Sequence, residues 1–187
     1  MIIGVAGKAR SGKDTVAEYL VKKYKFVRYS FADPIKYGCK EMFGFSDEQL
    51  WGNLKEVTDE HWGITPRKVL QIMGTEIAQF VFPTRMPELK KIGRYFWIHR
   101  FLKWHKENEN KNIVIPDVRF MHEVQALRRL ESKIIKVVRS SVVSQDTHLS
   151  ETELDGFKDF DTVLINDSSI PELNKQITFK MKKWIEN

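Results

Sequence analysis

Residues 2–15 read IIGVAGKARSGKDT, an apolar run that passes through a glycine-rich segment to a lysine. The run Ile2–Ala6 is short and almost continuously apolar, which is typical of a strand buried on both faces of a parallel sheet. From Lys13 onward, apolar residues recur at helical spacing, at Val16, Ala17, Leu20 and Val21. The segment therefore predicts a strand, a glycine loop and a helix in that order, which is how many α/β folds begin.

The glycine loop, from Gly7 to Lys13, fits the phosphate-binding pattern G-x-x-x-x-G-K. Glycines let backbone N–H groups converge on phosphate oxygens, the next helix directs its positive end at them, and the lysine adds a charge. Asp14 stands where Ser or Thr usually holds magnesium, and Thr15 follows it, which favours a small-molecule kinase over a GTPase. The residues expected to bind nucleotide phosphates are Gly7, Ser11, Gly12, Lys13, Asp14 and Thr15, with Asp14 also a magnesium ligand, directly or through water.

Composition limits the class of protein. A chain of 187 residues with 42% hydrophobic and 30% charged residues predicts one globular domain, residues 1–187. No apolar run is long enough to cross a membrane, and the first residues lack the basic start of a secretory signal, so we expect a cytoplasmic protein. The single cysteine, Cys39, excludes an internal disulfide. The net charge of +6 favours an anionic partner, and because basic and acidic residues are interleaved, a small phosphorylated molecule is favoured over nucleic acid.

The rest of the chain alternates strands with helices. Strands are expected at residues 26–32, 112–116, 133–138 and 162–165, and helices at 33–42, 65–80, 92–105, 121–130 and 171–185. This alternation predicts a three-layer α/β fold with a five-stranded parallel sheet and right-handed crossovers. The polar stretch 140–161 has no strong period and is a candidate mobile lid.

Three local signals place helix starts more closely. Asp33 before Pro34 is a good N-cap pair, and Ser46 with Gln49 fits a capping box. Thr65 is expected to cap the helix at 65–80. The residues expected to form one apolar face of that helix are Val69, Ile72, Met73, Ile77 and Phe80.

Charged residues at the ends of predicted strands are the next candidates for a site, because ligands bind at that edge of a parallel sheet. Asp117 and Arg119 follow the strand at 112–116. In one interpretation, Asp117 is the acid near magnesium and Arg119 binds a phosphate. In the other, Asp117 caps the next helix and Arg119 forms an ion pair on the surface. Arg139 follows the strand at 133–138 and is a second phosphate contact. Arg67 lies in the first turn of a helix, where a cation opposes the dipole, so it is either a phosphate ligand or an exposed side chain.

Two further groups allow two interpretations. His148, Ser150 and Glu151 lie in the polar stretch and, on their residue types alone, are typical of solvated loop side chains. The helix at 92–105 is both aromatic and basic. Its aromatic residues either stack on a base or belong to the core, and they are Tyr95, Phe96, Trp97, Phe101 and Trp104. Its basic residues are expected on a solvated face, and they are His99, Arg100, Lys103 and His105.

Several short blocks together resemble the deoxynucleoside-monophosphate kinases of large bacteriophages. They are GKARSGKDT (7–15), FADPIK (31–36), LQIMGTE (70–76) with Arg67, Trp97, PDVR (116–119) with Glu123, VVR (137–139), DTHLSE (146–151) and INDS (165–168). The resemblance implies the strand order 2-3-1-4-5 and transfer of the γ-phosphoryl group of ATP to a deoxynucleoside 5′-monophosphate. It extends over nearly the whole chain, from Ile2 to about Leu173.

The resemblance also implies roles for individual residues. Lys13 acts on the β and γ phosphates, and Mg²⁺ lies near Asp14 and Asp117. Asn166 and Asp167 belong to the adenine-side loop. Arg67 and Arg119 hold the acceptor phosphate. The acceptor-side residues are Asp33, Lys36, Arg67, Glu76, Trp97, Arg119, His148, Ser150 and Glu151.

The stretch 140–161 contains no arginine, whereas the lids of monophosphate kinases are usually rich in it. Arg10, inside the glycine loop, and Arg139 are therefore the expected sources of charge at the transferring phosphoryl group. Two alternatives stay open: another small-molecule kinase of the phosphomevalonate or dephospho-coenzyme A type, and a nucleotide-dependent nucleic-acid-binding module built on the helix at 92–105. We expect no stable nucleic-acid partner and no membrane partner, and a homodimer stays open.

Overall fold

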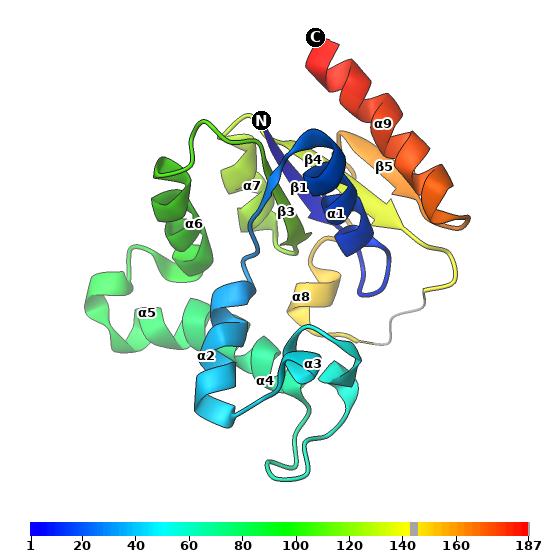
Figure 1. Cartoon of the computed structure of the whole chain (residues 1–187). Helices are drawn as coiled ribbons and strands as arrows, with labels where there is room; N and C mark the ends of the chain where they lie inside the picture. The colour runs from blue at the N-terminus through cyan, green and yellow to red at the C-terminus, as the bar shows by residue number, and fades with distance from the viewer. Residues whose placement is uncertain (143–145, 187) are drawn as a thin grey trace. The chain divides into compact units, whose positions relative to one another are not determined.

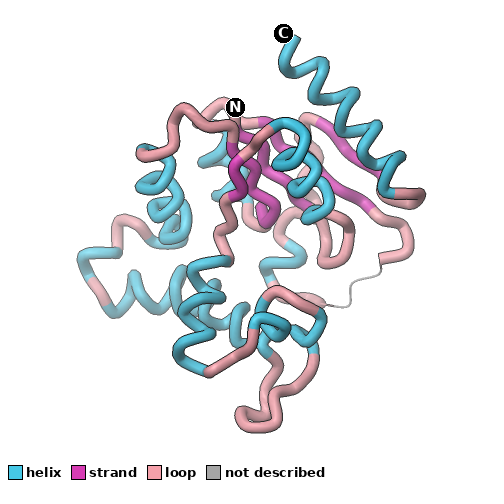
Figure 2. Tube along the Cα trace, in the orientation of Figure 1, coloured by secondary structure: helices cyan, strands magenta, loops and turns pink. Residues whose placement is uncertain are grey.

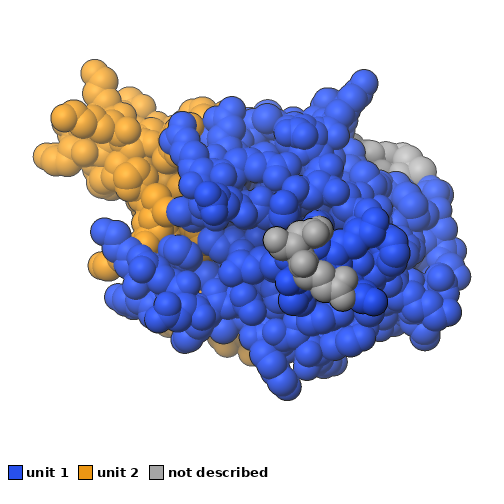
Figure 3. Space-filling model, turned by 90° about the horizontal axis from the view of Figure 1, so that it is seen from above, with its two compact units in different colours: residues 1–30, 105–187 blue, residues 31–104 orange. Residues whose placement is uncertain are grey.

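A computed structural model of the chain describes residues 1–142 and 146–186. The chain divides into two compact units, which Figure 3 shows in different colours. Residues 1–30 and 105–187 form one, called here the sheet unit, and residues 31–104 form the other, called the helical unit. Within the described residues, no helix combines the length and the apolar composition that crossing a bilayer requires.

The sheet unit contains a five-stranded parallel sheet in the order β2-β3-β1-β4-β5 (Figures 1 and 2). The strands are β1 (Ile2–Ala6), β2 (Val27–Arg28), β3 (Ile113–Val118), β4 (Lys133–Val138) and β5 (Thr162–Ile165). The predicted fold class and strand order are therefore confirmed. Strands β4 and β5 have the predicted bounds.

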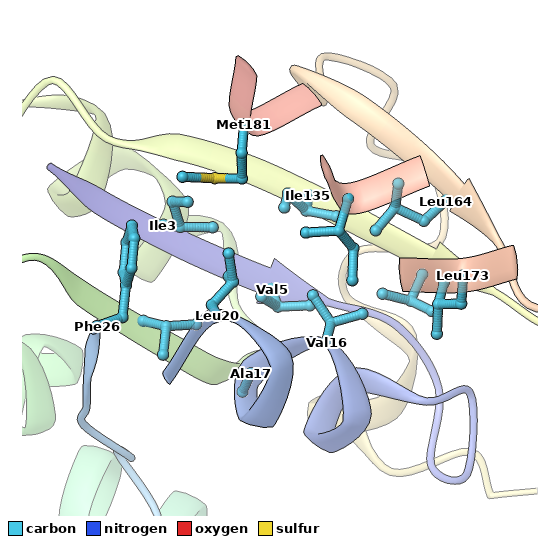
Figure 4. Close-up of a cluster of buried hydrophobic side chains, with 13 residues drawn as sticks. Ile3, Val5, Val16, Ala17, Leu20, Phe26, Ile135, Leu164, Leu173 and Met181 are labelled. Atoms are coloured by element: carbon cyan, nitrogen blue, oxygen red, sulfur yellow. The ribbon is translucent and has the colours of Figure 1, made fainter. Parts of the chain in front are cut away.

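Helices cover both faces of this sheet. α1 (Lys13–Tyr24) and α9 (Ile170–Glu186) pack on one face, where their apolar side chains meet those of β1, β4 and β5 (Figure 4). α7 (Met121–Arg128) packs on the other face. At Gly4 in β1, a methyl group would lie only 2.9 Å from Ile134 and 3.1 Å from Leu127, so glycine permits this close packing. The three layers are those predicted from the alternation of strands and helices.

Strand β3 continues past Pro116 through Asp117 to Val118, two residues beyond the predicted end. Ile115 pairs with Gly4, but Val118 pairs with Ala6, so β3 has one more residue than β1 between these two pairs. Such a bulge tolerates a proline and changes the direction of the side chains around it. Asp117 therefore lies in the irregular part of the strand, between the paired residues Ile115 and Val118.

Two other segments of the sheet unit differ from expectation. The strand expected at 26–32 is reduced to Val27–Arg28, because it is an edge strand that pairs with β3 over only two positions. The predicted lid, residues 140–161, contains a short helix, α8 (Leu149–Thr152). Residues 143–145 of the predicted lid lie outside the described residues.

The helical unit is built from short helices. They are α2 (Asp33–Phe43), α3 (Asp47–Leu50), η1 (Asn53–Glu56), α4 (Pro66–Gln71), η2 (Ile72–Val81), α5 (Phe82–Arg85), η3 (Pro87–Leu89), η4 (Gly93–Tyr95) and α6 (Phe96–Lys106). Ser46 and Gln49 form the predicted capping box, and Thr65 caps α4 as predicted. Asp33 is the first residue of α2 rather than its N-cap, because its carboxylate accepts a hydrogen bond from the Trp51 indole instead (3.2 Å).

The single apolar face expected over 65–80 is confirmed for Val69 and Met73, which pack in one cluster, and is wrong for Phe80. The reason lies beyond Gln71. There the chain continues as a π-helix, η2, whose i→i+5 hydrogen bonds widen each turn and rotate the following side chains. As a result Phe80 is 45% exposed, whereas Thr75, Ala78 and Gln79 are buried. The helix expected at 92–105 likewise begins with a 3₁₀ turn, η4, before α6.

Candidate phosphate-binding site

The loop between β1 and α1 requires its two glycines. Gly7 and Gly12 have φ values of 144° and 105°, and residues that carry a Cβ atom rarely adopt such values. A Cβ atom at Gly7 would lie 2.4 Å from the Val137 carbonyl oxygen, and one at Gly12 would lie 2.4 Å from the Asn166 amide nitrogen. The loop can therefore follow this path beside Val137 and Asn166 only because both positions lack side chains.

The start of α1 offers donors to an anion. Gly12, its N-cap, provides no side chain to accept from the first N–H groups of the helix. Ser11 is buried, and its hydroxyl has no hydrogen-bond partner among the described residues. A buried hydroxyl without a partner beside uncapped N–H groups fits a phosphate, which would accept from all of them. The Asn166 side chain, which follows β5, donates to the Ser11 carbonyl (2.9 Å) and holds the loop in place.

Lys13 is the central cation of the loop. Its side chain is buried, with the residue only 6% exposed, and its Nζ donates to the Lys8 carbonyl oxygen (2.7 Å). Burial, together with repulsion from Arg119, lowers the pKa of Lys13 to about 8. A buried ammonium group without a carboxylate bonded to it gains from an anionic ligand, which would replace its lost hydration.

Two carboxylates lie near the loop. Asp117 accepts a hydrogen bond from the buried Ser30 hydroxyl (2.8 Å), and Asp14 pairs with Arg28 (2.5 Å). Both carboxylates act electrostatically on Lys13, so they lie around one cation. Among the described residues, no three His, Cys, Asp or Glu side chains gather into a metal site. Mg²⁺ in phosphate sites commonly takes one or two carboxylates and completes its shell with phosphates and water, so these residues fit it.

Glu151, from α8, joins the loop to the end of β3. Its side chain is 1% exposed and forms an ion pair with Arg119, and its other carboxylate oxygen accepts from the Ala9 backbone N–H (3.3 Å). Its backbone carbonyl accepts from Lys8 Nζ, which also pairs with Asp155 (2.5 Å). The interpretation of Glu151 as a solvated loop residue is therefore wrong, because Arg119 and a loop amide compensate its burial.

Glu123 fixes the backbone beside Arg119. It is buried in the first turn of α7, and one carboxylate oxygen accepts from the backbone N–H groups of Arg119 (2.7 Å) and Phe120 (3.1 Å). Burial raises the pKa of Glu123 to about 8, against the opposing effect of these hydrogen bonds. Arg119 is thus held at its backbone by one acid and at its guanidinium by another.

A pocket of about 230 Å³ lies beside the loop within the sheet unit. Its walls come from the loop, the ends of β3 and β4, and the segment around α8. Of the predicted site residues, it brings together Gly7, Ser11, Arg119, Arg139, Ser150 and Glu151. Lys8, Lys136 and Asp155 also line it, and none of the three was a predicted site residue.

Other predicted residues of the sheet unit have local partners. The Asp167 carboxylate accepts from the Ser140 backbone N–H and hydroxyl (both 2.6 Å), and the hydroxyl bond lowers the pKa of Asp167. This contact ties the end of β5 to the residue after Arg139. His148 Nδ1 lies 2.8 Å from the Ser150 hydroxyl, and His148 is the N-cap of α8. Thr15 lies in the first turn of α1 and is half-buried, and Arg10 is exposed with a φ of 64°.

Five predicted acceptor-side residues lie in the helical unit. Lys36 Nζ lies 3.5 Å from the Asp33 carboxylate and over the Trp51 ring. Arg67 pairs with Glu56 (3.3 Å) and its side chain is only 18% exposed, so it is not the exposed arginine of the alternative interpretation. The Trp97 indole donates to the Gly74 carbonyl (2.7 Å), and Glu76 is exposed on η2.

Several residues around the loop were not predicted from the sequence. Lys136 carried a usable signal, because it is a charged residue inside the otherwise apolar strand β4. Ser30 and Asp155 carried none, since an isolated serine or aspartate in a loop is ordinary. Glu123 belongs to one of the sequence blocks that carry the family resemblance, but its structural role becomes clear only from its hydrogen bonds to the backbone.

The parallel sheet, its strand order and the glycine loop before α1 define the P-loop class of nucleotide-binding proteins. Protein TT1252 of Thermus thermophilus has a similar fold, with a TM-score of 0.51 and 19% identity over 98% of this chain and 97% of its own.

A family model for deoxynucleotide monophosphate kinases matches residues 1–62 and 40–177. A relative from Acanthamoeba polyphaga mimivirus is 41% identical over 184 residues, which cover 95% of this chain and 94% of the relative. The deoxynucleotide monophosphate kinase of Enterobacteria phage T4 is 24% identical, with 97% of this chain and 98% of its own covered. The chain belongs to the deoxynucleotide monophosphate kinase family.

Proposed function

We propose that this protein transfers the γ-phosphoryl group of ATP to a deoxynucleoside 5′-monophosphate, releasing ADP and the deoxynucleoside diphosphate. The observation that carries the proposal is the loop from Gly7 to Lys13, with a buried lysine, uncapped helix N–H groups and an unpartnered Ser11 hydroxyl, in a chain of this family. Phosphoryl transfer requires little covalent chemistry from a protein, so positioning and charge neutralisation are the main tasks of these residues.

On the donor side, the backbone N–H groups at the start of α1 bind the phosphates, and Lys13 neutralises charge on the β and γ oxygens. Asn166 keeps the loop in shape through the Ser11 carbonyl, and Asp167 fixes the chain after β4 through Ser140. Asp14 and Asp117 hold Mg²⁺, which supplies charge neutralisation to the phosphates when bound. Arg10 and Arg139 add positive charge at the transferring group.

On the acceptor side, Arg119 is the phosphate ligand whose geometry is best defined, because two acids fix its backbone and guanidinium. Asp33, Lys36, Arg67, Glu76 and Trp97 are the acceptor-side residues of the helical unit, with Asp33 orienting the sugar or phosphate. His148, Ser150 and Glu151 complete the set from the segment around α8. Closure of that segment over the nucleotides would exclude water, which otherwise hydrolyses ATP.

A coupled ADP-release assay with each of the four deoxynucleoside monophosphates tests the proposal. We expect at least one of them to increase ADP release well above the rate without acceptor. Parallel reactions with phosphomevalonate and dephospho-coenzyme A test the two other kinase types. Stimulation by one of these acceptors, with none by any deoxynucleoside monophosphate, would reject the proposed substrate class. The Lys13→Met variant is the control for contaminating kinases.

A further inference from the structure

Lys136 is unusual for its place in the sheet. It lies in β4, between β1 and β5, and its neighbours Ile135 and Val137 are buried in the core. Central strands of parallel sheets are covered on both faces and are normally apolar throughout. Placing a lysine there has an energetic cost, because its ammonium group loses part of its hydration.

The structure places Lys136 beside the phosphate loop. In the sheet register it pairs with Ala6, the residue immediately before Gly7. Because side chains alternate along a strand, Lys136 projects from the face opposite Ile135 and Val137. There it lines the same pocket as Gly7, Lys8 and Ser11.

Of the basic side chains that line this pocket, two have an acidic partner among the residues that the structure describes and Lys136 does not. Lys8 pairs with Asp155, and Arg119 pairs with Glu151. Within the described part of the chain, no carboxylate lies within ion-pair distance of Lys136, whose Nζ instead lies 5.1 Å from the centre of the Phe160 ring. A half-buried ammonium group next to an anion-binding loop is therefore left without an opposite charge.

We propose that Lys136 is a phosphate-binding residue of the donor site, which contacts the phosphate chain held by the loop. This deepens the proposed function and rests on it. Lysine suits the task, because its flexible stem can extend from the sheet and its ammonium group can donate three hydrogen bonds. It supplies charge that the arginine-free stretch 140–161 does not, and it does so from the rigid sheet.

The test compares two lysines of one strand. Lys136→Met removes the charge and keeps an unbranched apolar side chain over Phe160. Lys133→Met is the matched control, since Lys133 begins β4 and pairs with Asp161 (3.7 Å) away from the pocket lining. Calorimetry with inorganic tripolyphosphate measures binding without an acceptor or turnover. We expect Lys136→Met to weaken binding at least tenfold, Lys133→Met to change it less than twofold, and Lys136→Arg to retain it within threefold.

Two results would overturn the proposal. One is unchanged tripolyphosphate affinity in Lys136→Met. The other is an equal loss in Phe160→Leu, which keeps the charge and removes the ring, because that result assigns Lys136 a packing role. Thermal denaturation of each variant identifies any loss that comes from unfolding. Tripolyphosphate binding needs no acceptor, so this test does not depend on the acceptor. If the wild-type protein binds tripolyphosphate but phosphorylates no deoxynucleoside monophosphate, the proposed function is rejected and this test remains valid.

Discussion

The burial of Lys13 decides how its replacement should be designed. The lysine stem is enclosed rather than solvated, so Lys13→Ala would remove packing as well as charge. Lys13→Met keeps most of the volume. We expect turnover to fall at least about 100-fold, since a lost charge at the transferring group costs roughly this much. ADP release at saturating ATP and monophosphate measures it.

The stability of the same variant gives an internal control. Burial lowers the Lys13 pKa to about 8, so at pH 7 the folded state holds a charged amine that its surroundings disfavour. Removing that charge should leave the free energy of unfolding unchanged or higher. Turnover within tenfold of wild type, in a folded Lys13→Met protein, would contradict the role of Lys13.

Arg119 should matter for both stability and activity. Breaking a fully buried ion pair costs about 3–5 kcal/mol, and because the Arg119 side chain is 30% exposed we expect about 2–3 kcal/mol for Arg119→Ala. Urea denaturation measures this loss, and the KM for the monophosphate should rise. The double variant with Glu151→Gln should recover stability, because no unpaired buried carboxylate remains, without recovering the KM. Equal stability of Arg119→Ala and wild type would exclude this account.

Arg10 is the candidate for the charge that the stretch 140–161 lacks. It is exposed on the loop, in a left-handed backbone conformation with φ of 64°. If it acts as an arginine finger in cis, Arg10→Lys should reduce turnover about 10³-fold with little change in nucleotide affinity, because lysine lacks the planar fork. Steady-state kinetics at saturating substrates decide this, and an unchanged turnover number would remove Arg10 from the reaction.

At the scale of elements, the first turn of α7 depends on Glu123. Its carboxylate satisfies two backbone N–H groups, and burial raises its pKa to about 8. In the unfolded chain its pKa is near 4.5. Between these values the folded state binds a proton that the unfolded state does not, so this group makes stability fall as pH rises.

Glu123→Gln should remove that dependence while keeping an oxygen for both N–H groups. We expect the free energy of unfolding of the variant, relative to wild type, to increase from pH 5 to pH 8. Glu123→Ala removes the same titrating group, so its difference from wild type should follow pH in the same way, but its free energy of unfolding should lie about 1–2 kcal/mol below that of Glu123→Gln at every pH, because the cap is gone. Urea denaturation at several pH values separates them, and a pH-independent difference for Glu123→Gln would contradict the raised pKa.

At the scale of the whole molecule, the net charge of +6 is also compatible with the alternative function, a nucleic-acid-binding module. Of the four basic residues expected on a solvated face of α6, His99, Arg100 and Lys103 are exposed, whereas His105 is half-buried. A nucleic-acid-binding protein would bind single strands with a steep dependence on salt. We expect saturable ATP binding at physiological salt and no comparable oligonucleotide binding. Fluorescence anisotropy with a labelled single strand checks this, and tight, salt-sensitive binding would favour the alternative.

The sequence by itself determined the local structures and their order. The strand, glycine loop and helix at residues 2–24, the capping box at Ser46 and the strands β4 and β5 all follow from neighbouring residues. Such features depend on spacing, backbone freedom and local hydrogen bonds, which a sequence displays directly. The strand order and the family came from the resemblance, which rests on blocks distributed along the chain.

Only the tertiary structure decided which polar groups are buried and what compensates them. Glu151 is enclosed because Arg119 and Ala9, far from it in sequence, supply its partners. Lys136 faces the pocket because of the register of β4 on β1, and Asp117 lies in a bulge that forms only when β3 pairs with β1. The physical reason is common to all three: the energy of a buried charge depends on partners that folding brings together, and sequence spacing does not specify them.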